Sequence, residues 1–250
     1  MKILEVEGLR KSFGGVRALS DLSFSLAAGE RLAMIGPNGA GKTTCFNLIN
    51  GQLRPDAGTI SVAGETVQGL APRELWRRGV GRTFQIAAAF GSMTVRENVQ
   101  MALLSRERKS GSVFSLVQNL SLQESAEILD RTKLDGQAHR PCSELAYGDL
   151  KRVELAIALA GRPRLLLMDE PTAGMAASER HGLMDLVEKI SEENGISVLF
   201  TEHDMDVVFT YADRVIVLSE GELIAEGAPA AVRADARVRE VYLGEEAGHA

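Results

Sequence analysis

The chain has 250 residues, enough for one large domain or for a core domain with an embedded lobe. Charged residues make up 25% of the sequence and apolar residues 45%, as in ordinary globular proteins. The formal net charge of −6 argues against a general nucleic-acid binder, since such proteins carry a basic excess, although it leaves room for local basic patches. No signal peptide is evident, and no apolar run approaches the roughly 20 residues that span a bilayer.

The first third of the chain predicts short strands around a glycine-rich loop. Alternating residues predict half-buried strands, a continuous apolar run predicts a buried one, and Pro55-Asp56-Ala57-Gly58 is a strong turn signal. The expected elements are strands at 3–7, 22–26 and 32–35, a helix at 45–50, a strand at 59–63, a helix at 73–78 and a strand at 79–84. The outer short strands are typical of an antiparallel layer beside a ligand site.

The loop Gly36–Thr44 fits the pattern G-x-x-x-x-G-K-[ST] and lies between a predicted strand and a predicted helix. Its glycines let successive backbone N–H groups point inward, and the helix N-terminus adds a partial positive charge, so the loop is predicted to bind a polyphosphate. Lys42 is predicted to reach the terminal phosphates, and the Thr43 hydroxyl to ligate Mg²⁺. The expected nucleotide contacts are Asn38, Gly39, Ala40, Gly41, Lys42, Thr43 and Thr44. A glycine-rich turn without a ligand is the alternative.

The chain changes composition at about residue 87. Helical patterns at 95–104 and 122–134 follow, and no clear strand pattern interrupts them. We therefore predict a single domain with a helical subdomain at 87–148 inserted into a nucleotide-binding core formed by 1–86 and 149–250. Cys45 and Cys142 are expected to be unpaired, because one of them lies in the helix after the phosphate loop, and this favours a reducing compartment.

The remainder of the chain alternates helices with apolar strands, which indicates βαβ units and a parallel sheet. The expected elements are a helix at 150–160, strands at 165–168, 197–200 and 214–218, helices at 178–190 and 205–212, a hairpin strand at 222–225 and a helical tail at 229–243. The predicted fold class is therefore α/β: a phosphate-loop core with a mainly parallel sheet, an antiparallel β layer and an inserted helical subdomain.

Polar residues follow three of these strands. Asp169 and Glu170 lie at the carboxyl end of a buried strand, where open α/β sheets bind ligands. Asp169 suits a Mg²⁺ shell, and Glu170 suits a base that polarises the attacking water. His203, after the next strand, is predicted to reach a γ-phosphate, and Gln85 to hold Mg²⁺ or the nucleophilic water. Taken singly, each has a structural alternative, such as a solvated acid or a hydrogen-bonding histidine.

In this order the motifs resemble the ATP-binding subunit of an ABC transporter, and the resemblance covers essentially the whole chain. The matching elements are the Walker A motif at Gly36–Thr44, the Q-loop at Gln85, the Walker B motif at Leu165–Asp169, the catalytic glutamate Glu170 and the switch histidine His203. Together, ordered elements are far more specific than any one of them. The resemblance implies ATP and Mg²⁺ as cofactors and ATP hydrolysis as the activity.

The resemblance also implies a composite site. Phe13 matches the aromatic that stacks on adenine in this family, beside Val16, and Leu145–Asp149 occupies the signature position, with Tyr147 and Gly148 as nucleotide contacts. Gly148 opens a helix whose N-terminal amides form a second anion site. In the family, ATP lies between the Walker A motif of one subunit and the signature of the other, so the expected partner is a second copy or a second ATP-binding subunit, arranged head to tail.

Further partners implied by the family are transmembrane permease subunits and, indirectly, a solute-binding protein, with no nucleic acid. The expected location is peripheral, on the cytoplasmic face of the bacterial inner membrane. The signature, the run Glu170–Met175 and the tail Glu240–Gly244 resemble the branch of importers for branched-chain and hydrophobic amino acids, with urea and amide systems as close relatives. Two alternatives are a soluble ABC ATPase that does mechanical work and a regulatory subunit with a weakened nucleotide site.

Departures from the family pattern bear on the rate of hydrolysis. Ala146 replaces the usual signature serine, Asp149 replaces glutamine, and Ala176 stands where the loop after Glu170 usually ends in aspartate. Loss of one preorganised transition-state donor costs roughly 10²- to 10³-fold in rate in other enzymes. Because the Walker residues, Glu170, Gln85 and His203 are all present, we expect an active ATPase.

Overall fold

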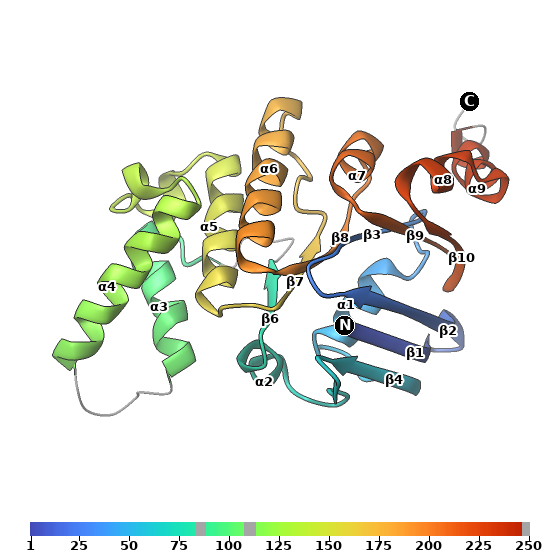
Figure 1. Ribbon diagram of the computed structural model, residues 1–250, viewed down its shortest axis with the longest axis horizontal. Coiled ribbons are helices and arrows are strands. Elements are labelled where there is room, and N and C mark those ends of the chain that lie inside the picture. The colour runs from blue at the N-terminus through green and yellow to red at the C-terminus, as the bar shows by residue number, and fades with distance from the viewer. Residues whose placement is uncertain (84–88, 108–113, 247–250) are drawn as a thin grey trace.

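The computed structural model describes residues 1–83, 89–107 and 114–246, which form two sheets flanked by helices (Figure 1). The antiparallel sheet contains β1 (Lys2–Phe13), β2 (Val16–Ala27), β4 (Ala57–Val62) and β5 (Glu65–Thr66), in the order β2-β1-β4-β5. The sequence predicts shorter strands at 3–7 and 22–26, but the hairpin pairs as far as Phe13 opposite Val16. Its tip is exposed on both faces, so it lacks the alternation that marks a half-buried strand.

The larger sheet lies between this layer and the main helices. It contains β3 (Arg31–Ile35), β6 (Val80–Thr83), β7 (Leu165–Asp169), β8 (Ser197–Thr201), β9 (Arg214–Ser219) and β10 (Glu222–Gly227), in the order β10-β9-β3-β8-β7-β6. Neighbours from β9 to β6 run parallel, whereas β10 pairs antiparallel with β9. Parallel strands end at the same edge of a sheet, so the carboxyl ends of β3, β7 and β8 lie together there. The predicted βαβ alternation is confirmed.

The described helices before residue 89 and after residue 160 are α1 (Lys42–Ile49), α2 (Pro72–Arg77), α6 (Ala177–Asn194), α7 (Met205–Tyr211), α8 (Pro229–Ala234) and α9 (Ala236–Glu246). The predicted helical tail is helical but broken at Asp235, whose backbone is extended. Its carboxylate accepts hydrogen bonds from the backbone N–H groups of Arg237 and Val238. An aspartate that caps in this way starts a new helix, which accounts for the break.

The described part of 89–146 carries α3 (Val95–Glu107) and α4 (Phe114–Arg131), with short 3₁₀ turns at Asp135–Gln137 and Cys142–Glu144, and α5 (Tyr147–Ala160) follows them. In Figure 1, α3 and α4 lie at one end of the molecule, and α5 lies between them and α6. Val99, Leu129 and Val153 belong to the same buried cluster as Met168 in β7. The helices at this end therefore share a continuous apolar core with the sheet.

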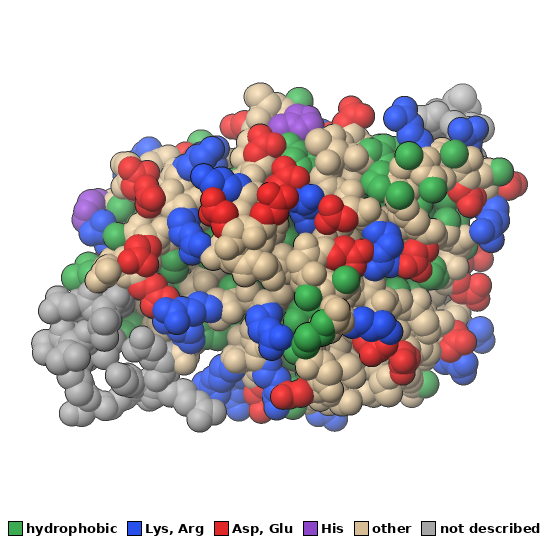
Figure 2. All heavy atoms as spheres, in the orientation of Figure 1, with side chains coloured by type: hydrophobic (Ala, Val, Ile, Leu, Met, Phe, Trp, Pro, Cys, Tyr) green, Lys and Arg blue, Asp and Glu red, His purple; other side chains and the backbone are tan. Residues whose placement is uncertain are grey.

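The cysteines and the helices agree with what the sequence predicts about disulfides and membrane spans. Cys45 and Cys142 are both buried and unpaired. Over the residues that the structure describes, no helix is both long and apolar enough to cross a membrane. On the face shown in Figure 2, acidic and basic side chains are intermixed, and hydrophobic side chains lie in small, scattered groups.

Candidate functional site

The phosphate loop connects β3 to α1, as the sequence predicts, and its glycines fit a crowded place. Gly39 and Gly41 have φ angles of 81° and 103°, which residues with a Cβ rarely adopt. A Cβ on Gly41 would lie 2.6 Å from the carbonyl oxygen of Ala18, and one on Gly36 would lie 2.2 Å from that of Leu218. The loop can therefore pass this close to β2 and β9 only with glycine at these positions.

The side chains of the loop divide into a buried lysine and an exposed rim. Lys42 is 7% exposed, and its ammonium group donates to the carbonyl oxygens of Gly36 and Pro37. Thr43, in the first turn of α1, is exposed, as are Asn38 and Gly39, whereas Thr44 is half-buried and Ala40 is buried. The N–H groups in the first turn of a helix have no partner within the helix, so this rim offers hydrogen-bond donors to an anion.

Asp169 ends β7 and is 3% exposed. Its Oδ1 accepts a hydrogen bond of 2.8 Å from the Thr201 hydroxyl on β8, and its Oδ2 lies 3.4 Å from a guanidinium nitrogen of Arg82 on β6. Burial lowers the pKa of Arg82, and the charge of Asp169 opposes that shift. Arg82 also donates to the Asn47 side chain on α1 at 2.9 Å, so it joins the helix of the phosphate loop to the carboxylate.

Glu170 follows in a left-handed backbone conformation, with φ at 50°. Such a conformation costs a residue other than glycine roughly 1–3 kcal/mol. Its N–H donates to the carbonyl oxygen of Thr201 at 3.1 Å and to the hydroxyl of the same residue at 3.0 Å, and these bonds hold the conformation in place. The carboxylate Oε1 then lies 2.9 Å from Nε2 of His203. The two residues that the sequence places after neighbouring strands are thus in contact.

Gln85 lies within 84–88, outside the described residues, so its predicted contact with Mg²⁺ or water stays a prediction. We also expect Gln85 and the apolar residues 86–90 to link the site to the helical segment; only Ala89 and Phe90 of these are described, so this link stays a prediction. β6 pairs with β7 as far as Thr83, opposite Met168.

Phe13 and Val16 lie opposite each other at the tip of the β1–β2 hairpin. Phe13 is 46% exposed and Val16 is 70% exposed. The Lys11 ammonium lies 5.4 Å from the centroid of the Phe13 ring. An aromatic ring that the core does not cover is available to stack on a flat ligand. Adenine stacking on Phe13 stays a prediction that this exposure favours.

Tyr147 and Gly148 begin α5. Tyr147 is 47% exposed, with the Lys151 ammonium 5.5 Å from its ring centroid, and a Cβ on Gly148 would lie 3.4 Å from the Glu179 carboxylate. No hydrogen bond between described residues joins either one to the phosphate loop. These contacts suit the prediction that the signature serves another subunit.

The departures at Ala146 and Ala176 coincide with helix N-caps. Ala146 caps α5 and Ala176 caps α6, and both have extended backbones with no capping side-chain oxygen. Serine or aspartate is strongly preferred there, because the side chain accepts a bond from a free N–H group. Asp149, the third departure, forms an ion pair with Arg152 and accepts a bond from Gln137.

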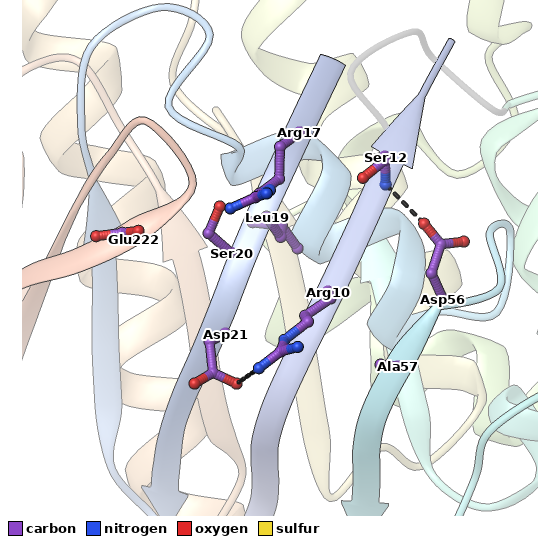
Figure 3. A pocket seen from close by; sticks show the side chains of 9 residues that line it. All are labelled: Arg10, Ser12, Arg17, Leu19, Ser20, Asp21, Asp56, Ala57 and Glu222. Atoms are coloured by element: carbon purple, nitrogen blue, oxygen red, sulfur yellow. Dashed lines mark hydrogen bonds and ion pairs between the residues drawn. The ribbon is translucent and has the colours of Figure 1, made fainter. Parts of the chain in front are cut away.

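A pocket of about 390 Å³ opens on the antiparallel sheet, apart from the phosphate loop. It is lined by Arg10, Ser12, Arg17, Leu19, Ser20, Asp21, Asp56, Ala57 and Glu222 (Figure 3). Arg10 pairs with Asp21 at 3.1 Å, and Asp56 accepts bonds from the Ser12 N–H at 2.7 Å and from Lys11 at 2.8 Å. None of the predicted site residues lines it.

A phosphate loop with its buried lysine, next to two carboxylates at a strand end, defines a nucleoside triphosphatase of the phosphate-loop class. The sequence profile of the family described as ABC transporter matches residues 19–173, more than half of the chain. The chain belongs to this family and is an ATPase of it. A second profile, described as branched-chain amino acid ATP-binding cassette transporter, matches residues 222–248. The resemblance stated from the motifs is confirmed, and so is the predicted fold class.

Individual relatives match nearly the full length. The high-affinity branched-chain amino acid transport ATP-binding protein BraF of Pseudomonas aeruginosa is 37% identical over 250 residues, which are 97% of this chain and 98% of that protein. A crystal structure of an ATP-binding cassette of an ABC transporter in its ADP conformation is 34% identical, with a TM-score of 0.86 and coverage of 98% and 99%. A dimeric post-hydrolysis cassette bound to ADP and phosphate is 26% identical, with a TM-score of 0.78 and coverage of 90% and 98%.

Proposed function

We propose that the chain is the ATP-hydrolysing subunit of an importer. Its proposed cargo is branched-chain or other amino acids, or the related solutes urea and amides. The chemistry rests on one observation above others, the 2.9 Å contact between His203 and Glu170, next to Asp169 and at the edge where the phosphate loop leaves β3. The proposed cargo rests on relatives such as BraF and on the profile match at 222–248.

Each side chain has a distinct part in this proposal. Glu170 orients and polarises the attacking water, and His203 holds the Glu170 carboxylate and contacts the γ-phosphate. Lys42 turns from the carbonyl oxygens of its own loop to the terminal phosphates. Phe13 and Val16 support the adenine. These parts divide substrate binding from water activation, so their variants are separable in kinetics.

Mg²⁺ is the proposed metal, and the donors available to it are oxygen atoms, which this hard cation prefers. The buried Asp169 carboxylate and the exposed Thr43 hydroxyl would hold it, with Gln85 as a further ligand. The Thr201 hydroxyl fixes the orientation of Asp169 by its bond to Oδ1. When bound, the metal neutralises charge on the phosphates.

A head-to-tail dimer is the proposed active assembly, with a second copy or a second ATP-binding subunit. Tyr147 is exposed, and among the described residues no hydrogen bond joins it to the phosphate loop of the same chain. Both observations favour a signature that acts on the partner's ATP. The solved dimer of a related cassette, bound to ADP and phosphate, shows that such cassettes dimerise. Closure is driven by ligand that binds the closed state better than the open one.

Transmembrane permease subunits are the proposed membrane partners, and a solute-binding protein acts indirectly through them. We place the chain at the cytoplasmic face of the bacterial inner membrane, as a peripheral subunit. The helices at 87–148 form the proposed docking subdomain. Four large apolar side chains in this part of the chain are 38–59% exposed: Phe90, Met101, Leu104 and Leu122. Exposed apolar side chains of this kind favour a protein contact.

A Glu170→Gln variant tests the function. It is expected to bind ATP normally, to stabilise the dimer, and to lose at least about 100-fold in hydrolysis and in ATP-dependent uptake of labelled leucine by the assembled transporter. Glu193→Gln, which removes an exposed charge from the end of α6, is the matched control and is expected to leave both rates unchanged.

The outcomes separate the alternatives. If Glu170→Gln hydrolysed ATP at the wild-type rate, Glu170 would not be the base. If the wild-type chain binds ATP but does not hydrolyse it, the chain is a regulatory subunit. The missing N-cap side chains at Ala146 and Ala176 are the reason to test this alternative. If the rate of ATP hydrolysis were the same with and without the membrane partners, a soluble mechanical ATPase would be favoured.

A further inference from the structure

Glu202 lies between Thr201 and His203 and has no part in the mechanism above, yet its side chain is buried, with 4% exposure. Its Oε1 accepts a hydrogen bond of 2.8 Å from the backbone N–H of Thr172, and its Oε2 accepts one of 3.3 Å from the backbone N–H of His203. The two oxygens therefore hold two different loops, one after β7 and one after β8.

These contacts close a ring that includes both Glu170 and His203. The chain runs from Glu170 through Pro171 to Thr172, and hydrogen bonds continue from Thr172 across Glu202 to His203. The contact of 2.9 Å from His203 Nε2 to Glu170 Oε1 completes the ring. Because proline has no N–H, Thr172 offers the first backbone donor after Glu170 that can anchor this loop.

A carboxylate suits this position better than the amide of similar shape. Two N–H groups need two acceptors, and an amide offers one acceptor and an NH₂ group that would face the second donor. Burial raises the pKa of Glu202, and the negative charge of Glu170 adds to the shift, although the hydrogen bonds from Thr172 and His203 oppose it. The buried charge thus costs free energy that a neutral side chain would not, which is expected where geometry matters more than stability.

We propose that Glu202 is a positioning residue that fixes the separation and orientation of Glu170 and His203 by holding the backbone of both loops. It acts through those two residues and not on the substrate. The inference rests on the proposed roles of Glu170 and His203, and it extends them by naming what keeps the pair together.

The first experiment compares Glu202→Gln with the wild type in the purified full-length chain. Misplacement of reacting groups by about 1 Å can cost 10²-fold, so we expect kcat for ATP to fall by about 10- to 100-fold. The KM for ATP is expected to stay within about twofold, because the phosphate loop with Lys42 and the adenine contact at Phe13, which carry most of the proposed binding, are unaltered. The matched control is Asp206→Asn, which removes an exposed charge four residues further along and is expected to leave kcat unchanged.

A second variant and a coupling measurement exclude a merely structural role. Glu202→Asp keeps the charge but is one methylene too short to reach both N–H groups, so kcat is expected to fall again, and this variant carries the test if Glu202→Gln folds poorly. In a chain that already carries Glu170→Gln, adding Glu202→Gln is expected to lower the residual rate by a clearly smaller factor than it lowers kcat in the wild type, since one of the two positioned groups, the Glu170 carboxylate, is already gone.

The results distinguish this inference from the proposed function. If Glu170→Gln is inactive while Glu202→Gln keeps a wild-type kcat, Glu202 does not position the pair and the proposed function stands. If Glu202→Gln raises KM as much as it lowers kcat, or lowers the rate equally in both backgrounds, its role is structural and the inference is wrong. If Glu170→Gln hydrolyses ATP at the wild-type rate, the proposed function itself is wrong.

Discussion

Gly221 is a residue at which three segments meet. Its carbonyl oxygen accepts a bond of 2.9 Å from the Ser20 N–H on β2, and its own N–H donates to Ala40 in the phosphate loop at 3.1 Å. A Cβ on Gly221 would lie 2.7 Å from the carbonyl oxygen of Ala18 and 2.9 Å from Leu19 Cα. The turn after β9 thus holds the phosphate loop through Ala40, and position 221 has no space for a side chain larger than that of glycine.

A Gly221→Ala variant is therefore expected to lose about 3 kcal/mol of unfolding free energy, from the left-handed backbone and the backbone collision together. Gly64→Ala is a matched control, because φ is 82° at Gly64 and 80° at Gly221, but a Cβ at Gly64 meets nothing within 4 Å. The control is expected to lose about 1 kcal/mol. Urea unfolding measures both; equal losses would mean that the contact with Ala18 relaxes freely.

At the scale of elements, an ion-pair cluster joins α3, α4 and the end of α5. Arg106 on α3 makes two bonds of 2.8 and 2.7 Å with the Glu124 carboxylate on α4, and donates to the carbonyl oxygen of Ala160, the last residue of α5. Arg162, just beyond α5, also lies 3.1 Å from Glu124. Bidentate pairs of this type are stronger than ordinary surface ion pairs.

A Glu124→Gln variant is expected to lower the free energy of unfolding by about 1 kcal/mol at pH 7. The hydrogen bond from Arg106 is the main cause of a lowered pKa of Glu124 in the folded chain. A carboxyl whose pKa is lower in the folded state stabilises the fold above the unfolded-state pKa, roughly 4.3, and loses that contribution as pH falls through the folded-state value. The difference between wild type and variant should therefore shrink as pH falls below about 4.3 and vanish below the folded-state pKa of Glu124.

The measurement is denaturant unfolding of both chains at several pH values, with Glu127→Gln as the control. Glu127 is exposed on the same helix and accepts a bond of 3.2 Å from Gln123 alone among the described residues. A loss within about 0.5 kcal/mol is expected for it at every pH. A pH-independent loss at Glu124→Gln would mean that its packing, not its charge, holds the helices.

At the scale of the whole molecule, the proposed composite site makes a prediction about mixtures. Glu170→Gln is expected to inactivate the site on its own phosphate loop, whereas Gly148→Asp, which adds a charge next to the Glu179 carboxylate, is expected to inactivate the site on the partner's loop. A mixed dimer of the two variants keeps one site with every wild-type part. If the dimer contains two copies of this chain, mixing the two inactive proteins restores ATP hydrolysis.

An equal mixture is expected to reach about a quarter of the wild-type rate, because half of the dimers are mixed and each has one intact site. ATPase assays of the two variants, alone and mixed, check this. The wild type diluted with Gly148→Asp serves as the control for exchange of subunits. No recovery despite exchange would exclude composite sites in a homodimer.

The sequence predicts the parts of the fold that are encoded locally. The apolar runs give the parallel strands, and the motif Gly36–Thr44 gives the phosphate loop, since glycine spacing and a following lysine are visible without a structure. Residues whose meaning depends on packing are missed. Thr201, Arg82 and Glu202 act across strands, and nothing in their neighbours along the chain reveals the partner in space.

Other differences also have local causes. The exposed hairpin tip shows no alternation, so the sequence places the end of the first strand too early and the start of the second too late. The break at Asp235 depends on a capping bond that a single aspartate in a helical tail does not reveal. The sequence can predict that Glu170 and His203 lie close together, because both follow neighbouring strands of a parallel sheet. It cannot predict the distance between their side chains, since this distance depends on the left-handed backbone at Glu170.

The helix α5 converts a small rotation into a displacement. It has 14 residues, which makes it about 21 Å long, and it begins at Tyr147 and ends at Ala160, where Arg106 grips the last carbonyl oxygen. A tilt of about 10° around that grip moves the opposite end by about 3.6 Å, more than the length of a hydrogen bond. In the proposed composite site, a helix of this length would let a small displacement on the α3 side determine whether Gly148 reaches the partner's nucleotide.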